Sequence, residues 1–298
     1  MRFKRIWETR LTAETKMYLF RWLLTAIILI ASASSSWTQS TTDLVIPNFW
    51  DPQERVVKPG LQGVQRMKFL TVTDFPPFSF IDRQKQLRGF HVDLARAICA
   101  ELNLSNVCQI QAIPFEEIEQ TLKSGGAEAA LAGHAITAQS RQRFGFSRPY
   151  FKLPARFIAK PATGLSEPLA RSLIDKTLGI VVDTAHAAYA KAFLGNTMLR
   201  QFDSLGSAMT ALEKDEVSAV FADGLALSFW IQAKGENACC EFVGGPYLDE
   251  TYFGRGLAVT LAPQETDLEI AVNYALRSIN DKGIFGELYL RYFPISLY

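Results

Sequence analysis

The stretch from residue 89 to residue 150 constrains the fold most, because its apolar residues recur with the spacings of alternating helices and strands. The predicted elements are a strand over 69–73, a helix from Phe90, a strand near 107–113, a helix over 115–123 and a short strand near 128–132. Strands that alternate with helices predict a parallel sheet covered by helices on both faces.

The same alternation restarts in the second half of the chain. It predicts a strand over 178–182, a helix over 185–193 with Asp183 or Thr184 as its N-cap, a helix over 205–212 and a strand over 217–221. A helix directly after Asp223, a strand over 256–260 and a long helix after that strand complete the pattern. A chain of 298 residues is long enough to bury two cores. The sequence therefore predicts two α/β units.

Charge and motif content argue against several classes of protein. The formal net charge is +1, which gives no electrostatic reason to expect nucleic acid as a partner. The three histidines show no metal-ligand spacing, and neither a G-x-S-x-G motif nor a glycine-rich phosphate loop occurs. We therefore expect no metal site and no cofactor.

The N-terminus has the pattern of a cleavable secretory signal. Lys16 and Arg21 precede an apolar run over 22–30, which ends in Ala31-Ser32-Ala33. The run is shorter than the roughly 20 residues that span a bilayer, so an uncleaved anchor is the less favoured alternative. We expect a signal peptide over 1–33, with Met1 or Met17 as the start, and an extended leader over 34–65.

An ordered set of short motifs carries a family resemblance. They are Gly89-Phe90, Asp93-Leu94-Ala95, Phe115, Leu122, Gly133, Ile136-Thr137 and Phe146-Ser147-x-Pro149-Tyr150. Over about residues 66–293 the chain resembles periplasmic solute-binding proteins of the amino-acid-binding family. The resemblance implies a two-lobed α/β clamshell in which each lobe is a mostly parallel sheet flanked by helices.

The resemblance also implies domain bounds and a function. Lobe 1 would comprise 66–156 plus 250–298 and lobe 2 would comprise 157–249, with crossings near 154–162 and 244–254. The expected protein is a periplasmic monomer, not an enzyme, that delivers an amino acid or related carboxylate to the permease of an ABC importer. Its lobes would close on the ligand by hinge motion.

Two other classes of protein are alternatives to a solute-binding protein. A dehydratase of the prephenate or arogenate type is the alternative on the same fold, with Glu128 or Asp223 as its acid. A receptor's sensor domain is disfavoured, because no second membrane segment follows the first.

The resemblance assigns ligand-contacting roles to residues near strand ends and helix starts. Asp74 and Asp223 match acids that hold an amine, Phe75 and Phe115 match apolar contacts, and the start of the predicted 185–193 helix offers free amides to an anion. The family's carboxylate-binding arginine falls at Ser140, one residue before Arg141. The full expected set is Asp74, Phe75, Phe115, Gly133, His134, Thr137, Arg141, Thr184, Ala185, His186 and Asp223.

Export makes disulfides chemically reasonable. Cys99 falls near a helix end and Cys108 at the next strand start, two elements that several family members bridge, so we expect a Cys99–Cys108 disulfide. Cys239 and Cys240 are adjacent, and they could be two thiols, a ring closed between them or partners of other cysteines.

Overall fold

The computed structural model describes residues 46–298 except 52, 54–55, 62, 264 and 294. The expected signal peptide, and the leader as far as residue 45, lie outside the described residues. Within the described ranges, no helix is both long enough and apolar enough to cross a membrane.

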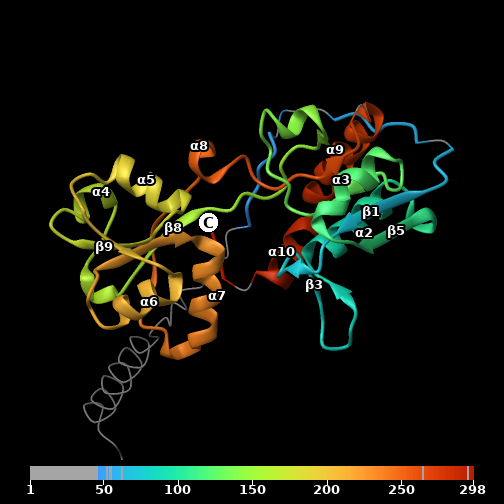
Figure 1. The fold of residues 1–298 in the computed structure, drawn as a ribbon. Helices are drawn as coiled ribbons and strands as arrows, with labels where there is room; N and C mark the ends of the chain where they lie inside the picture. The colour runs from blue at the N-terminus through green and yellow to red at the C-terminus, as the bar shows by residue number, and fades with distance from the viewer. Residues whose placement is uncertain (1–45, 52, 54–55, 62, 264, 294) are drawn as a thin grey trace, which may run out of the picture. The chain divides into compact units, whose positions relative to one another are not determined.

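The first sheet has the strand order β5-β1-β6-β13-β7 (Figure 1). Its strands are β1 (Met67–Thr71), β5 (Cys108–Ala112), β6 (Ala129–Ala130), β7 (Gly145–Phe146) and β13 (Thr260–Leu261). Strand β1 pairs in parallel with β5 and β6, whereas β13 runs antiparallel to β6 and β7. This sheet and its helices are called lobe 1 below.

Helices cover both faces of this sheet because its strand residues alternate between two cores. Phe69 packs in the core that also holds residues of α2 (Phe90–Glu101), α9 (Thr266–Asp281) and α10 (Ile284–Tyr292). Its neighbour Leu70 packs in the opposite core, with residues of α3 (Phe115–Lys123). Helix α2 buries Phe90, Leu94 and Ile98, which are spaced as one helix face.

A small hairpin sheet that the residue pattern did not reveal follows β1. It consists of β2 (Asp74–Phe75), β3 (Ser79–Ile81) and β4 (Leu87–Arg88), paired antiparallel. Gly89 then starts α2 with a φ of 133°, and a side chain there would collide with the Phe78 carbonyl, so this turn requires glycine. These strands were missed because they have only two or three residues, too few to show a period.

The second sheet has the order β10-β9-β11-β8-β12. Its strands are β8 (Ala155–Ala159), β9 (Thr177–Val181), β10 (Met198–Phe202), β11 (Ala219–Asp223) and β12 (Glu241–Tyr247). Its helices are α4 (Leu169–Ser172), α5 (Ala185–Phe193), α6 (Leu205–Glu213), α7 (Gly224–Lys234) and α8 (Glu250–Phe253). Together they are called lobe 2 (Figure 1).

Lobe 2 is also packed on both faces. Phe157 and Phe221 point into a core shared with α5, whereas Ile158 and Val220 point into the core shared with α6. Among the described residues, each of the two sheets combines two parallel with two antiparallel pairings. Short 3-10 turns occur at Ser105–Val107, Ser140–Gln142, Pro161–Thr163 and Gly235–Asn237.

Two of the predicted helices match the structure exactly, at 115–123 and 185–193, and Thr184 is the N-cap of the second. The prediction of a strand over 256–260 is wrong in most of its length, because β13 begins only at Thr260. Ser147 explains the difference. Its backbone N–H donates to the Val259 carbonyl, and its hydroxyl accepts from the Val259 N–H, so these backbone groups pair outside a regular ladder.

The chain passes from β7 to β8 through residues 147–154 and returns after β12 through 248–259. The range that we expected for the first crossing, 154–162, is largely occupied by β8. The C-terminal residues lie beside β8 (Figure 1), where the buried Arg156 donates a hydrogen bond of 3.0 Å to the Leu297 carbonyl. Leu297 in turn donates its N–H to the Tyr289 hydroxyl on α10.

The predicted disulfide between Cys99 and Cys108 is present and links α2 to β5 across a Cα–Cα distance of 6.1 Å. The open question about the adjacent pair is also answered, because Cys239 and Cys240 are bonded to each other just before β12.

Candidate functional site

A cavity of about 420 Å³ lies in lobe 1 where β1 and β5 end. Ligands of open α/β sheets bind outside the carboxyl ends of the strands, so this is the expected place for a binding surface. Its walls are Val72, Thr73, Asp74, Ala112, Ile113, Pro114, Phe115 and Glu116. The cavity therefore combines an apolar floor and one aromatic ring with two carboxylates.

Phe115 and His134 form an aromatic pair beside this cavity. Phe115 opens α3, remains 49% exposed and stacks on the His134 ring with the centroids 4.6 Å apart. Burial, together with the nearby positive charge of Arg143, lowers the pKa of His134 to about 4. His134 is therefore neutral at pH 7, and the pair offers a ligand an uncharged aromatic surface.

Phe75 lies close to the loop that contains Gly133. The Phe75 ring packs on Phe78 at 4.8 Å and on His91 at 5.7 Å, and a Cβ at Gly133 would lie only 2.9 Å from it. Gly133 also has a φ of +78°, so glycine allows both the turn and the close approach. Asp74, the residue before Phe75, is exposed.

Thr137 and Ser140 tie the following loop to itself. The Ser140 hydroxyl accepts a hydrogen bond from the Thr137 N–H at 2.9 Å and donates to the Ala135 carbonyl at 2.7 Å, while the Thr137 hydroxyl accepts from the Ser140 N–H at 3.0 Å. Ser140 is only 6% exposed. The serine at the family's arginine position therefore has an internal structural role.

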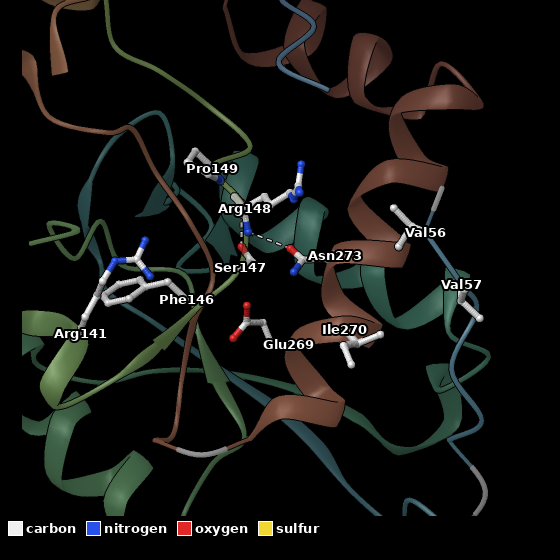
Figure 2. Close-up of a pocket in the computed structure, with 10 residues that line it drawn as sticks. All are labelled: Val56, Val57, Arg141, Phe146, Ser147, Arg148, Pro149, Glu269, Ile270 and Asn273. Carbon is white, nitrogen blue, oxygen red and sulfur yellow. Dashed lines mark hydrogen bonds between the residues drawn. The ribbon is translucent and has the colours of Figure 1, made fainter. Parts of the chain in front are cut away.

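Arg141 lines a different cavity, of about 590 Å³. Figure 2 shows its guanidinium beside the Phe146 ring, 5.8 Å from the ring centroid, with Glu269 and Asn273 reaching the same cavity from α9. This cavity shares no lining residue with the one that contains Asp74 and Phe115. The Arg141 guanidinium thus lines another cavity than Asp74 and Phe115, although the Arg141 backbone N–H donates to the carbonyl of Thr137 at 3.1 Å.

In lobe 2 the expected residues gather where β9 and β11 end. The Thr184 hydroxyl caps α5 by accepting from the Ala187 N–H at 3.1 Å, which places Ala185 and His186 in the first turn of the helix. Asp223 ends β11 and caps α7 in the same way, because its carboxylate accepts from the Ala226 N–H at 2.8 Å.

His186 and Asp223 lie within electrostatic range of each other. Burial lowers the pKa of His186, and the negative charge of Asp223 partly opposes that effect. Burial also raises the pKa of Asp223, against the hydrogen bond from Ala226. The His186 ring stacks on Phe253 at 5.2 Å, so an aromatic pair again adjoins a carboxylate.

Phe253 and Glu116 were not among the residues predicted to contact ligand. Phe253 lies on α8, a four-residue helix capped by Asp249, and nothing in its local sequence indicates that it returns to the start of α5. Glu116 could have been found, because it directly follows Phe115 in the first turn of α3.

The two acids considered for a dehydratase lie in different surroundings. Glu128 precedes β6, at the amino ends of the parallel strands, and forms an ion pair of 2.6 Å with Arg66. It is therefore at the edge of the sheet opposite to the cavity.

Within the described ranges, no group of three or more His, Cys, Asp or Glu side chains could hold a metal ion.

Residues 67–295 match the family model of bacterial extracellular solute-binding proteins, family 3. The chain is similar to the putative ABC transporter arginine-binding protein 2 of Escherichia coli, with 28% identity over 78% of this chain and 92% of that protein. It is also similar to the histidine-binding periplasmic protein of Salmonella typhimurium, with 24% identity over 78% of this chain and 90% of that protein.

Two solved structures share the fold at 18% identity. The L-cystine solute receptor of Neisseria gonorrhoeae, in its unliganded open conformation, superimposes with a TM-score of 0.67 over 78% of this chain and 94% of that one. A substrate-binding domain of a putative amino acid ABC transporter from Streptococcus pneumoniae gives 0.66 over 76% of this chain and 100% of that one. With a family match over 67–295 and two α/β lobes, the chain belongs to the bacterial extracellular solute-binding proteins, family 3.

Proposed function

We propose that this protein is the periplasmic substrate-binding component of an ABC importer and that it encloses an amino acid or a closely related small amine between its lobes. One observation carries the proposal. Each lobe presents a carboxylate and an aromatic pair where its parallel strands end, namely Asp74 with Phe115–His134 and Asp223 with His186–Phe253. The names of the similar proteins support an amino acid as the ligand class.

All the predicted residues except Thr184 and Arg141 have a direct role in this proposal. Asp74 and Asp223 bind amines, because a carboxylate forms charge-assisted hydrogen bonds with an ammonium group. Phe75 and Phe115 contact the apolar part of the ligand, whereas Gly133 and Thr137 hold the loop that positions His134. The amides of Ala185 and His186 complete the lobe 2 surface.

Export and partners also belong to the proposal. Residues 1–33 act as the cleaved signal peptide, and the mature chain works as a monomer that docks on a membrane permease. The proposal assigns no catalytic residue, since the similar proteins are named as binding proteins.

A thermal-shift screen of the mature protein against the twenty amino acids and their simple amine derivatives tests the proposal. A ligand at about 100 times its Kd adds roughly 2.7 kcal/mol of stability, which raises the Tm of a chain of this size by about 5 °C. We expect such a shift with at least one compound and no turnover of prephenate. Turnover of prephenate, or a screen without any shift, would contradict the proposal.

A further inference from the structure

The carboxyl ends of the parallel strands carry a concentrated negative charge. The strands that pair in parallel are β1, β5 and β6 in lobe 1 and β9, β10 and β11 in lobe 2. The five residues after each of them include no Lys or Arg, but they include the acids Asp74, Glu116, Glu117, Asp183 and Asp203. Asp223 ends β11 itself. The whole chain has 31 Lys and Arg against 30 Asp and Glu, so this imbalance is local.

Side chains elsewhere do not neutralise the acids that line the site. Asp74, Glu116 and Asp223 form no ion pair with any residue in the part of the chain that the structure describes. In contrast, Glu101 pairs with Lys282 at 2.6 Å, and Glu119 pairs with both Lys123 and Arg143. A cationic ligand would supply the missing charge.

Four cations of lobe 1 and of the connections between the lobes are already engaged. Arg143, whose charge acts on His134, forms a 2.6 Å ion pair with Glu119. Lys152 and Arg255, on the two connections between the lobes, both approach Glu250. Arg141 lies at the Phe146 ring in the separate cavity of Figure 2. None of these leaves a guanidinium or ammonium group at the Asp74–Phe115 cavity.

A carboxylate and an amine would therefore have very different energies in this site. Like charges at close range disfavour each other's ionised forms, so a ligand carboxylate among these acids is destabilised. The amides at the start of α5 attract an anion, but Asp183 precedes the Thr184 N-cap of that helix and Asp223 acts on His186, which offsets the attraction. An amine gains from the same acids and from the faces of Phe115 and Phe253.

We propose that the site recognises the amines of its ligand and does not require a carboxylate, so that its preferred ligands are small organic dications, either diamines or guanidino-amines. The proposal rests on the proposed binding function and specifies its ligand class. One positive group would lie against Asp74 and Glu116 in lobe 1 and the other against Asp223 in lobe 2, with the carbon chain between the aromatic pairs.

Calorimetric titration of the mature protein with matched pairs of compounds tests the ligand class. The pairs are arginine with agmatine, lysine with cadaverine and ornithine with putrescine, which differ only by the carboxylate. We expect that in the best-binding pair the carboxylate-free compound binds at least as tightly as the amino acid. An amino acid that binds more than about tenfold tighter than its amine, a difference of about 1.4 kcal/mol, would overturn the proposal.

Two neighbouring glutamates provide a matched pair of variants. Glu116 lines the cavity and Glu117 does not, although both lie in the first turn of α3. We expect Glu116→Gln to weaken agmatine or cadaverine binding by about tenfold, the size of one charge-assisted hydrogen bond, and Glu117→Gln to change it by less than about twofold. Equal effects of the two variants would show that Glu116 makes no direct contact and would overturn its assignment.

The outcomes separate this proposal from the proposed function. Binding of neutral or acidic amino acids without any binding of the six cationic compounds would refute the dication class and leave the binding function intact. If no amino acid or amine bound at all, the proposed function itself would fail.

Discussion

The replacement of Asp223 by asparagine separates the ligand-binding role of this residue from its structural role. Asp223 caps α7 through a 2.8 Å hydrogen bond from the Ala226 N–H, and asparagine is as good an N-cap as aspartate. Asp223→Asn therefore removes the negative charge and keeps the cap. We expect it to abolish most ligand binding without unfolding the protein.

The structure sets the size of the loss in ligand binding and the direction of the change in stability. A charge-assisted hydrogen bond contributes about 1.5–3 kcal/mol, so losing the carboxylate should weaken amine binding by about 10- to 100-fold. The free energy of unfolding without ligand should instead stay the same or rise in Asp223→Asn. Burial raises the pKa of Asp223 above its ordinary value of 3.8, so the folded state holds this proton more tightly than the unfolded state does. Asp223 therefore loses its contribution to stability as the pH rises through that raised pKa, and its charged form is a cost at pH 7.

Chemical denaturation at pH 7 without ligand, together with calorimetric titration of the best ligand, measures both quantities. Asp223→Asn should unfold at the same or higher denaturant concentration than the original protein, whereas Asp223→Ala should lose about 1 kcal/mol with the cap. If Asp223→Asn bound ligand as tightly as the original protein, Asp223 would not be an amine contact. If it unfolded as easily as Asp223→Ala, the argument from the cap would be wrong.

Three further predictions follow from the structure. Replacing both Cys99 and Cys108 by serine should lower the free energy of unfolding by about 2–3 kcal/mol, since their disulfide closes a segment with a sequence separation of 9; a loss below about 1 kcal/mol in urea denaturation would contradict this. Burial lowers the pKa of His91 to about 3, so stability should fall as the pH drops from 6.5 toward 3, and His91→Gln should flatten that dependence in denaturation curves at pH 7 and pH 4.5. Ser140→Ala should lower the free energy of unfolding by about 1–3 kcal/mol, because the loop loses the hydrogen bonds of the Ser140 hydroxyl. In the same loop, Arg141→Lys should change ligand affinity by less than about twofold, and a larger loss would place that guanidinium on the ligand.

Local sequence signals were sufficient for the longer elements. The α3 and α5 helices show apolar spacing over nine residues each, and Thr184 or Asp183 supplied an N-cap signal before α5. The hairpin strands β2, β3 and β4 have two or three residues each and are defined by pairing with one another, which no local period reports. The strand expected over 256–260 failed for a related reason, because Ser147 binds the backbone of Val259 from a distant part of the chain.

In the candidate site too, local sequence signals identified some residues, whereas contacts between distant parts of the chain determined others. Asp74, Phe115 and Asp223 could be placed from sequence because each stands at a strand end or helix start. The contact between His186 and Phe253 could not, since it joins α5 to α8 across more than sixty residues. The position of Arg141 depended on the loop that Ser140 closes with hydrogen bonds to Thr137 and Ala135. Only the three-dimensional contacts reveal that loop.

The central claim is that the two lobes enclose a small cationic ligand, and small-angle X-ray scattering of the mature protein tests it most directly. The measurement compares the radius of gyration without ligand and with saturating concentrations of the tightest compound found by calorimetry. Hinge closure around the ligand predicts a smaller radius of gyration in the bound state, with Asp223→Asn remaining at the unliganded value under the same conditions. An unchanged radius of gyration for the original protein at full occupancy would contradict binding by enclosure.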